Sequence, residues 1–236
     1  MLIGSLRSVA ESVHRPDAIE AATVKGAQTV LCQCAAPLRP SEPVTFITDF
    51  ADQAVILPLA LAVAIGLLAQ GWWRGAGAWT LAVCATFGLM LVFKIAFLAC
   101  THVFGPVDVR TPSGHVAAAT VVAGGLATLL LRRRMMVLPL AGLAAIVIGV
   151  SRLVLGVHSL PEVVIGALVG LVGAVGLLWL AGPVPPRLNA RRIGLIAVVM
   201  MLVFHGLHLP AEAQISANAW RFAQMFGVCQ ADQVRP

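Results

Sequence analysis

Six long stretches of this chain contain no Asp, Glu, Lys or Arg. They are residues 53–70, 75–93, 116–131, 135–151, 163–181 and 193–210. A helix needs about 20 mostly apolar residues to cross the core of a bilayer, with about 17 as the lower limit. The six stretches are close to this length, and short polar links separate them. The sequence therefore predicts an all-α fold, a polytopic transmembrane bundle of about six spans.

The overall composition agrees with a membrane protein and excludes two other classes. Apolar residues make up 59% of the chain and charged residues 11%, whereas a soluble domain has about 25% charged residues. Disorder is excluded by the high apolar content. The net charge of +6 does not indicate a nucleic acid partner, because the basic residues occur in short clusters between apolar segments, as in membrane proteins. The expected partner is the bilayer.

The five cysteines do not indicate a metal or another cofactor. Cys32, Cys34, Cys84, Cys100 and Cys229 form no CxxC pair and no His/Cys ligand spacing, so no metal site is predicted from them. Cys84 lies in the middle of a span and is expected to be a small core residue. A disulfide among the other four is left open.

Three regions follow from this pattern. Residues 1–52 form a polar N-terminal region that is partly amphipathic or extended, because the prolines between 37 and 43 indicate an extended linker. Residues 53–210 hold the six spans. Residues 211–236 are expected to form a C-terminal interfacial helix and tail. The role of the N-terminal region and the oligomeric state are left open.

The basic loops predict the orientation in the membrane. Residues 132–134 and 182–192 carry six Arg and no acidic residue, and they lie two spans apart. Short loops rich in Lys and Arg stay in the cytoplasm. The links 94–115 and 151–162 then face outward. We expect an integral protein of a bacterial inner membrane, with these links on the periplasmic side.

Polar side chains from three separate segments meet at that outer surface. They are Lys94, Arg110, Ser113, Gly114, His115, Arg152, His158 and Glu162. The third and fourth spans cross the membrane in and back, so residue 152 returns to the side of residue 113. Ionisable residues at membrane depth are costly and usually functional. This cluster is therefore the candidate site.

The residue types in the cluster indicate a phosphate ligand. Arg presents a planar fork that fits phosphate oxygens, and Lys adds a point charge. Ser113 and Gly114 precede an apolar helix, whose N-terminus offers unpaired N–H groups to an anion. Without a metal-ligand cluster, cations and N–H groups must stabilise the charge. Two histidines can then divide nucleophilic attack and proton transfer.

Two motifs in the cluster resemble those of a known family. Residues 112–115 read PSGH, and residues 151–158 read SRLVLGVH, with 35 residues between the motifs. Glu162 follows His158 after three residues. This pattern resembles the type 2 phosphatidic acid phosphatase (PAP2) superfamily, in its membrane-integral branch, over roughly residues 54–210.

The resemblance implies a role for each matching residue. His158 would attack the phosphoryl group and form a phosphohistidine, and Glu162 would orient His158. His115 would protonate the leaving oxygen. The resemblance further implies that Ser113, Gly114 and Arg152 bind the phosphate oxygens and that no metal ion is needed.

Two positions depart from the family pattern. The first motif of the family reads Lys, six residues, Arg-Pro, but Lys94 is followed at those positions by Thr101 and His102. Arg110 is expected to supply the missing guanidinium from another backbone position. Glu162 replaces the usual Asp. Glu is one methylene longer and can still accept a hydrogen bond from an imidazole.

Two other features are interpreted structurally. His205, His208 and Glu212 lie near the same surface and are interpreted as polar residues of the membrane interface. The glycine-rich stretch 166–176 is expected to allow close packing of helices.

The sequence predicts an integral-membrane lipid phosphatase that acts on a phosphomonoester or diphosphate. Candidate substrates are undecaprenyl diphosphate, phosphatidic acid, phosphatidylglycerol phosphate and a lipid A phosphate, and the outward-facing site favours an isoprenoid diphosphate. Phosphotransfer to an acceptor other than water is an alternative, and so is a degenerate relative that binds a lipid phosphate without turnover. Soluble vanadium haloperoxidases share the motifs, but the six apolar spans argue against that function.

Overall fold

The computed structural model describes residues 42–99, 111–131 and 134–209, together with Gln214, Ile215, Asn218, Arg221 and Met225. These residues belong to one compact unit, residues 40–236. All regular secondary structure within the described residues is helical. The prediction of an all-α fold is therefore confirmed.

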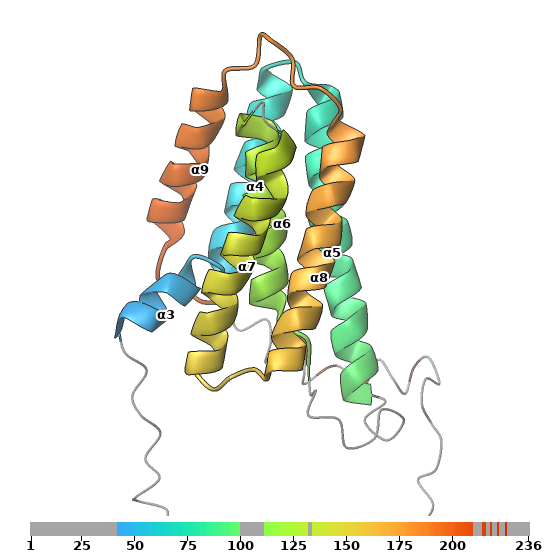
Figure 1. Cartoon of the computed structure of the whole chain (residues 1–236), viewed down its shortest axis with the longest axis vertical. Helices are drawn as coiled ribbons and strands as arrows, with labels where there is room; N and C mark the ends of the chain where they lie inside the picture. The colour runs from blue at the N-terminus through green and yellow to red at the C-terminus, as the bar shows by residue number, and fades with distance from the viewer. Residues whose placement is uncertain are drawn as a thin grey trace, which may run out of the picture. The chain divides into compact units, whose positions relative to one another are not determined.

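Each charge-free stretch of the sequence forms most of one helix of the bundle. The helices are α4 (Gln53–Ala69), α5 (Trp73–Ala99), α6 (Gly114–Leu130), α7 (Val137–Val154), α8 (Leu160–Ala181) and α9 (Ala190–Phe204) (Figure 1). A shorter helix, α3 (Glu42–Asp49), precedes α4, and a 3-10 turn, η1 (Arg134–Met136), precedes α7. The helix α3 begins at the end of the proline-rich segment, with Pro43 in its first turn, where proline is tolerated.

Four helical segments are long and apolar enough to cross a membrane. They are Pro43–Ala69, Trp73–Leu98, Arg134–Val154 and Leu160–Ala181. Helix α6 is also apolar but has 17 residues, and α9 has 15. At about 1.5 Å per residue, these two helices are about 25 Å and about 22 Å long, which is less than the hydrocarbon thickness of about 30 Å. Helix α4 also has 17 residues, but the longer segment Pro43–Ala69 contains it. The fold is a polytopic transmembrane bundle in which α6 and α9 are the short members.

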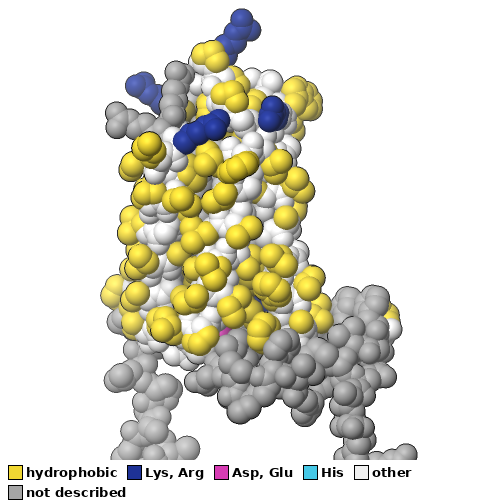
Figure 2. Space-filling model, turned by 45° about the vertical axis from the view of Figure 1, so that its right-hand side comes forward, with side chains coloured by type: hydrophobic (Ala, Val, Ile, Leu, Met, Phe, Trp, Pro, Cys, Tyr) yellow, Lys and Arg dark blue, Asp and Glu magenta, His cyan; other side chains and the backbone are white. Residues whose placement is uncertain are grey.

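The outer surface of the bundle suits contact with lipid. Figure 2 shows hydrophobic side chains over most of the described part of this face, with Lys and Arg near one end. Large apolar side chains such as Leu61, Val172 and Trp179 are exposed. An apolar surface of this extent is unusual for a soluble protein. The helices therefore face lipid on the outside and one another on the inside.

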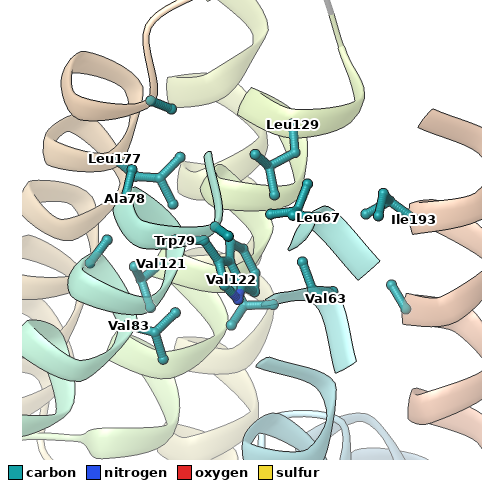
Figure 3. Packing of buried hydrophobic residues seen from close by; sticks show 14 of the residues in the cluster. Val63, Leu67, Ala78, Trp79, Val83, Val121, Val122, Leu129, Leu177 and Ile193 are labelled. Carbon is teal, nitrogen blue, oxygen red and sulfur yellow. The ribbon is translucent and has the colours of Figure 1, made fainter. Parts of the chain in front are cut away.

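Helix α6 lies at the centre of the bundle and packs against α5, α7 and α8. Trp79 of α5 is fully buried among Val121, Leu129 and Leu177 and other members of the main core (Figure 3). Its indole N–H donates a hydrogen bond to the carbonyl of Ala60 in α4, at 2.9 Å. A buried indole needs such a partner. This contact joins α4 and α5 within the core.

Glycines on α8 allow α6 to approach closely, as the sequence predicted. A Cβ at Gly170 would lie 2.5 Å from the Cβ of Thr120 and 2.6 Å from the carbonyl oxygen of Ala117. A Cβ at Gly166 would overlap the carbonyl oxygen of Ser113. Small residues are the usual way to bring membrane helices together. The glycines therefore set the distance between α8 and the start of α6.

The two basic loops lie at the same end of the bundle, as predicted. Arg134 lines a small cavity together with Gly182 and Val184 from the link between α8 and α9. The Nε of Arg74 at the start of α5 donates to the carbonyl of Leu180, at 2.9 Å. This basic end is opposite the N-terminus of α6.

Some expectations differ from the structure or lie outside the described residues. Cys84 is exposed on α5, so the prediction that it packs in the core is wrong. The other cysteines and the region before residue 42 lie outside the described residues. In the C-terminal tail, the five described residues are helical, and the tail is otherwise outside the description.

Substituting one glycine of α8 should weaken the bundle. We expect Gly170→Ala to lower the free energy of unfolding by about 1–3 kcal/mol, because its methyl group would overlap α6. The matched control is Gly176→Ala on the same helix, where an added Cβ meets nothing within 4 Å. Thermal unfolding of the purified protein in detergent measures both. Equal melting temperatures for the two variants would contradict close packing at Gly170.

Candidate active site

The candidate site lies where the N-termini of α6 and α8 meet the C-terminus of α7. A buried apolar cluster joins these three helix ends and includes Val116, Ile148 and Val163. Ile148 lies one turn before Arg152, and the other two follow His115 and Glu162 in the sequence. The cluster therefore holds the predicted site residues of three helices at one end of the bundle.

The link between α7 and α8 presents His158 to Glu162. The Nδ1 atom of His158 lies 2.8 Å from Oε2 of Glu162, and the two side chains are 4% and 5% exposed. Gly156 has a φ of +66°, which lets the chain turn after α7. Pro161 lies in the first turn of α8, where proline suits the helix. The link thus turns sharply and starts a new helix beside its own histidine.

Glu162 also binds the backbone on both sides of the site. Its Oε2 accepts a hydrogen bond from the N–H of Ser159, at 3.1 Å, which satisfies a donor at the start of α8. Its Oε1 accepts from the N–H of Thr111, at 2.7 Å. Its backbone carbonyl accepts from the N–H of Ser113, at 3.0 Å. One residue therefore connects the PSGH segment to His158.

Ser113 combines a helix start with a buried hydroxyl group. It is the N-cap residue of α6, but its side chain makes no capping hydrogen bond. Its side chain is 0% exposed, and its Oγ has no hydrogen-bond partner among the described residues. Buried hydroxyl groups nearly always have a partner. A phosphate oxygen at the N-terminus of α6 would supply one.

Lys94 and Arg152 bring positive charge to the same end of the bundle. Lys94 is buried and lies one turn after Met90 of α5, which packs against Ala117 of α6 and Val169 of α8. Arg152 lies in the last turn of α7 and is half-buried. Lys and Arg side chains are usual partners of phosphate oxygens. Both cations suit an anionic ligand.

His115 is in the first turn of α6 and faces Asp52 at the start of α4. Its Nε2 lies 3.8 Å from Oδ2 of Asp52, and the two side chains are 12% and 14% exposed. Asp52 was not among the predicted site residues. Its sequence position, just before an apolar span, is fully explained by a helix N-cap, so no signal in the sequence connects it with His115.

Other polar residues of this end have structural roles. Ser151 accepts a hydrogen bond from the hydroxyl of Thr48 and donates to the carbonyl of Ile148, both at 2.7 Å. The ring of His205 packs against Phe46 and Phe50. His208 is 58% exposed and lies 3.6 Å from Asp49. Arg110, Thr101, His102 and Glu212 lie outside the described residues.

Comparison with protein families gives the family of the chain. The model of the PAP2 superfamily matches residues 55–184, which is more than half of the chain. The chain belongs to the PAP2 superfamily. Members of this superfamily are generally phosphatases that act on phosphate esters. Comparisons with curated proteins and with solved structures found no match.

The structure gives a physical reason for one departure from the PAP2 pattern. Glu162 stands where the pattern has Asp, and both of its carboxylate oxygens accept hydrogen bonds. The additional methylene extends the reach of the carboxylate from α8. With this reach, Glu162 binds His158 through one oxygen and Thr111 through the other.

Proposed function

We propose that this PAP2 protein is a lipid phosphatase. It removes a terminal phosphate from an amphiphilic phosphomonoester or diphosphate through a phosphohistidine on His158. The observation that carries the proposal is the position of Glu162, whose carboxylate oxygens bind His158 and Thr111 and whose backbone carbonyl binds Ser113 of the PSGH segment. This arrangement brings a nucleophile and a helix N-terminus to one place.

The first step is attack on phosphorus by Nε2 of His158. Glu162 accepts from Nδ1–H, which favours the tautomer with the lone pair on Nε2. The P–N bond forms as the bond from phosphorus to the leaving oxygen breaks. His115, in its imidazolium form, gives its proton to that oxygen. The dephosphorylated lipid then leaves.

The second step restores the histidines. Neutral His115 takes a proton from a water molecule, which attacks the phosphorus of the phosphohistidine. The P–N bond breaks, inorganic phosphate leaves, and His158 recovers its lone pair. Over the two steps, the proton returns to His115 and the phosphoryl group passes from the lipid to water.

Cations and backbone N–H groups stabilise the phosphoryl charge in this mechanism. Lys94 and Arg152 supply the positive charge, and the Ser113 hydroxyl and the N-terminus of α6 supply hydrogen-bond donors. Among the described residues, no group of three or more His, Cys, Asp or Glu could hold a metal ion. As the resemblance to the PAP2 superfamily implies, we propose a metal-independent reaction. Arg110 remains our candidate for the guanidinium that the first motif lacks.

An apolar cavity of about 550 Å³ supports an amphiphilic substrate. It runs between α6 and α7, from Ala51 and Ile148 near the site to Leu130 and Leu131 near the basic end. Ala51 and Ile148 also belong to the buried cluster that joins the helix ends at the site. Because the cavity is apolar and shares these two residues with the cluster at the site, we assign it to the hydrocarbon tail of the substrate.

The position of the basic loops supports a periplasmic location for the candidate site. Arg134 and the link after α8 lie at the end opposite the candidate site, and basic loops stay in the cytoplasm. We infer a periplasmic site in a bacterial inner membrane. An isoprenoid diphosphate such as undecaprenyl diphosphate is the favoured substrate class, because such carriers are released on that face.

Replacing the nucleophile should abolish phosphate release. Purified protein in detergent, assayed in EDTA with a panel of phospholipids and isoprenoid phosphates, should release inorganic phosphate. We expect His158→Ala to lower the rate by at least about 10³-fold, because no other group replaces the covalent step.

The matched control is His208→Ala, which removes an exposed histidine at the same end of the bundle. It should retain the rate of the unmutated protein. Release by His158→Ala at an unchanged rate would contradict the assignment of the nucleophile. Loss of all activity in EDTA would contradict the metal-independent mechanism.

Filling the apolar cavity should discriminate between long and short substrates. We expect Ala144→Phe, which adds a ring inside the cavity, to lower kcat/KM for a long-chain lipid phosphate by about tenfold, equivalent to about 1.4 kcal/mol. A short-chain analogue should lose much less. The matched control is Ile146→Phe, an exposed position of α7 outside the cavity. Equal losses for both chain lengths would contradict binding of the tail in this cavity.

A further inference from the structure

Asp52 occupies a junction between three parts of the chain. As the N-cap residue of α4, its Oδ1 accepts from the N–H of Ala54, at 2.8 Å. The same oxygen lies 3.3 Å from the N–H of Leu209, which follows α9. Its Oδ2 lies 3.8 Å from Nε2 of His115. One carboxylate oxygen thus fixes the side chain, and the other faces the histidine.

This junction lies at the edge of the family core. The family match begins at residue 55 and ends at residue 184, so it contains His115 but neither Asp52 nor Leu209. The motifs that identify the superfamily therefore assign no role to Asp52. Its role must be inferred from its contacts in this structure.

We propose that Asp52 is a positioning residue that holds His115 in its protonated form for donation to the leaving oxygen. This inference rests on the proposed function. An imidazolium within about 4 Å of a carboxylate is favoured over the neutral ring. Asp52 keeps its charge throughout, since the proton passes from His115 to the leaving oxygen and returns from water.

The surroundings keep the Asp52 carboxylate in place. It is mostly buried, its backbone begins α4, and the positive end of the helix dipole favours a negative charge at this position. The pair of Asp49 and His208 differs from that of Asp52 and His115, because the side chain of His208 is 58% exposed whereas that of His115 is 12% exposed. Asp52 is therefore a fixed charge beside a largely buried histidine.

The two histidines of the site then have different carboxylate partners. His158 has a direct hydrogen bond of 2.8 Å to Glu162, which fixes its tautomer as a nucleophile needs. His115 has a longer ion pair of 3.8 Å to Asp52, which favours its charge. These partners match the separate tasks of nucleophile and proton donor.

The variant Asp52→Asn separates the charge from the helix cap. Asn is as good an N-cap residue as Asp, so its side-chain oxygen can still accept from Ala54. Its amide nitrogen would then face His115 and could not accept a proton from it. Melting temperatures of the variant and the unmutated protein in detergent should agree within a few degrees.

The readout is the dependence of the rate on the leaving group. A short-chain alkyl phosphate such as dioctanoyl phosphatidic acid needs a proton on its leaving oxygen, whereas p-nitrophenyl phosphate has a stable anionic leaving group. We expect Asp52→Asn to lower kcat/KM for the alkyl substrate by about 10–100-fold, which is less than the full contribution of a general acid, about 10²–10⁴-fold, because His115 remains in place. The aryl substrate should lose less than about threefold.

Two further variants complete the test. Asp49→Asn, which removes the carboxylate beside the exposed His208, should leave both rates unchanged. His115→Asn should show the same selective loss as Asp52→Asn but larger, and the double variant should be no slower than His115→Asn alone.

Three results would overturn the inference. Asp52→Asn could be as fast as the unmutated protein, it could lose both activities equally, as a purely structural role requires, or its effect could add fully to that of His115→Asn. If the unmutated protein hydrolysed neither substrate nor any lipid phosphate, the proposed function would fall together with this inference. In the first three cases the unmutated protein is still an active phosphatase. Failure of this inference is therefore distinguishable from failure of the proposed function.

Discussion

The carboxylate of Glu162 is the interaction on which the candidate site depends. It satisfies an N–H at the start of α8, holds His158 at 2.8 Å and binds the N–H of Thr111 at 2.7 Å. Gly166, one turn later, lets the backbone of Ser113 lie directly against α8. A charged acceptor buried with several donors is strongly favoured over an unpaired one. The same hydrogen bonds of Glu162 therefore cap α8 and hold the residues of the site together.

The membrane imposes the second constraint. Backbone groups in a bilayer must be satisfied within the protein, so a break in a helix is tolerated only where other groups bind it. Helix α6 is about 25 Å long and begins at the site, where Glu162 binds the segment before it. The apolar cavity along α6 and α7 is lined by Ala51 and Ile148 of the buried cluster at this end of the bundle. In the proposed function, the start of α6 binds the phosphate and the cavity beside α6 binds the hydrocarbon tail.

The sequence predicts the features that depend on local patterns. The charge-free stretches predict the helices, and the resemblance to the PAP2 motifs implies that Glu162 orients His158, which the 2.8 Å contact between them agrees with. Asp52 could not be predicted, because its contact with His115 depends on how α4 packs against α6. The exposure of Cys84 could not be predicted either. A helix that is apolar on all sides does not show in its sequence which side faces lipid. The burial of Ser151 against Thr48 depends on α3, which the proline pattern does not predict.

Trapping the phosphorylated enzyme tests the proposed mechanism most directly. The purified protein would be mixed with a lipid substrate labelled in its terminal phosphate, quenched within one turnover, and analysed by peptide mass spectrometry under alkaline conditions that preserve phosphohistidine. The proposal predicts a phosphoryl group on His158 that is absent from His158→Ala and that is replaced by free phosphate as the reaction proceeds. A label on another residue, or rapid phosphate release with no labelled protein at any time, would contradict a covalent intermediate on His158.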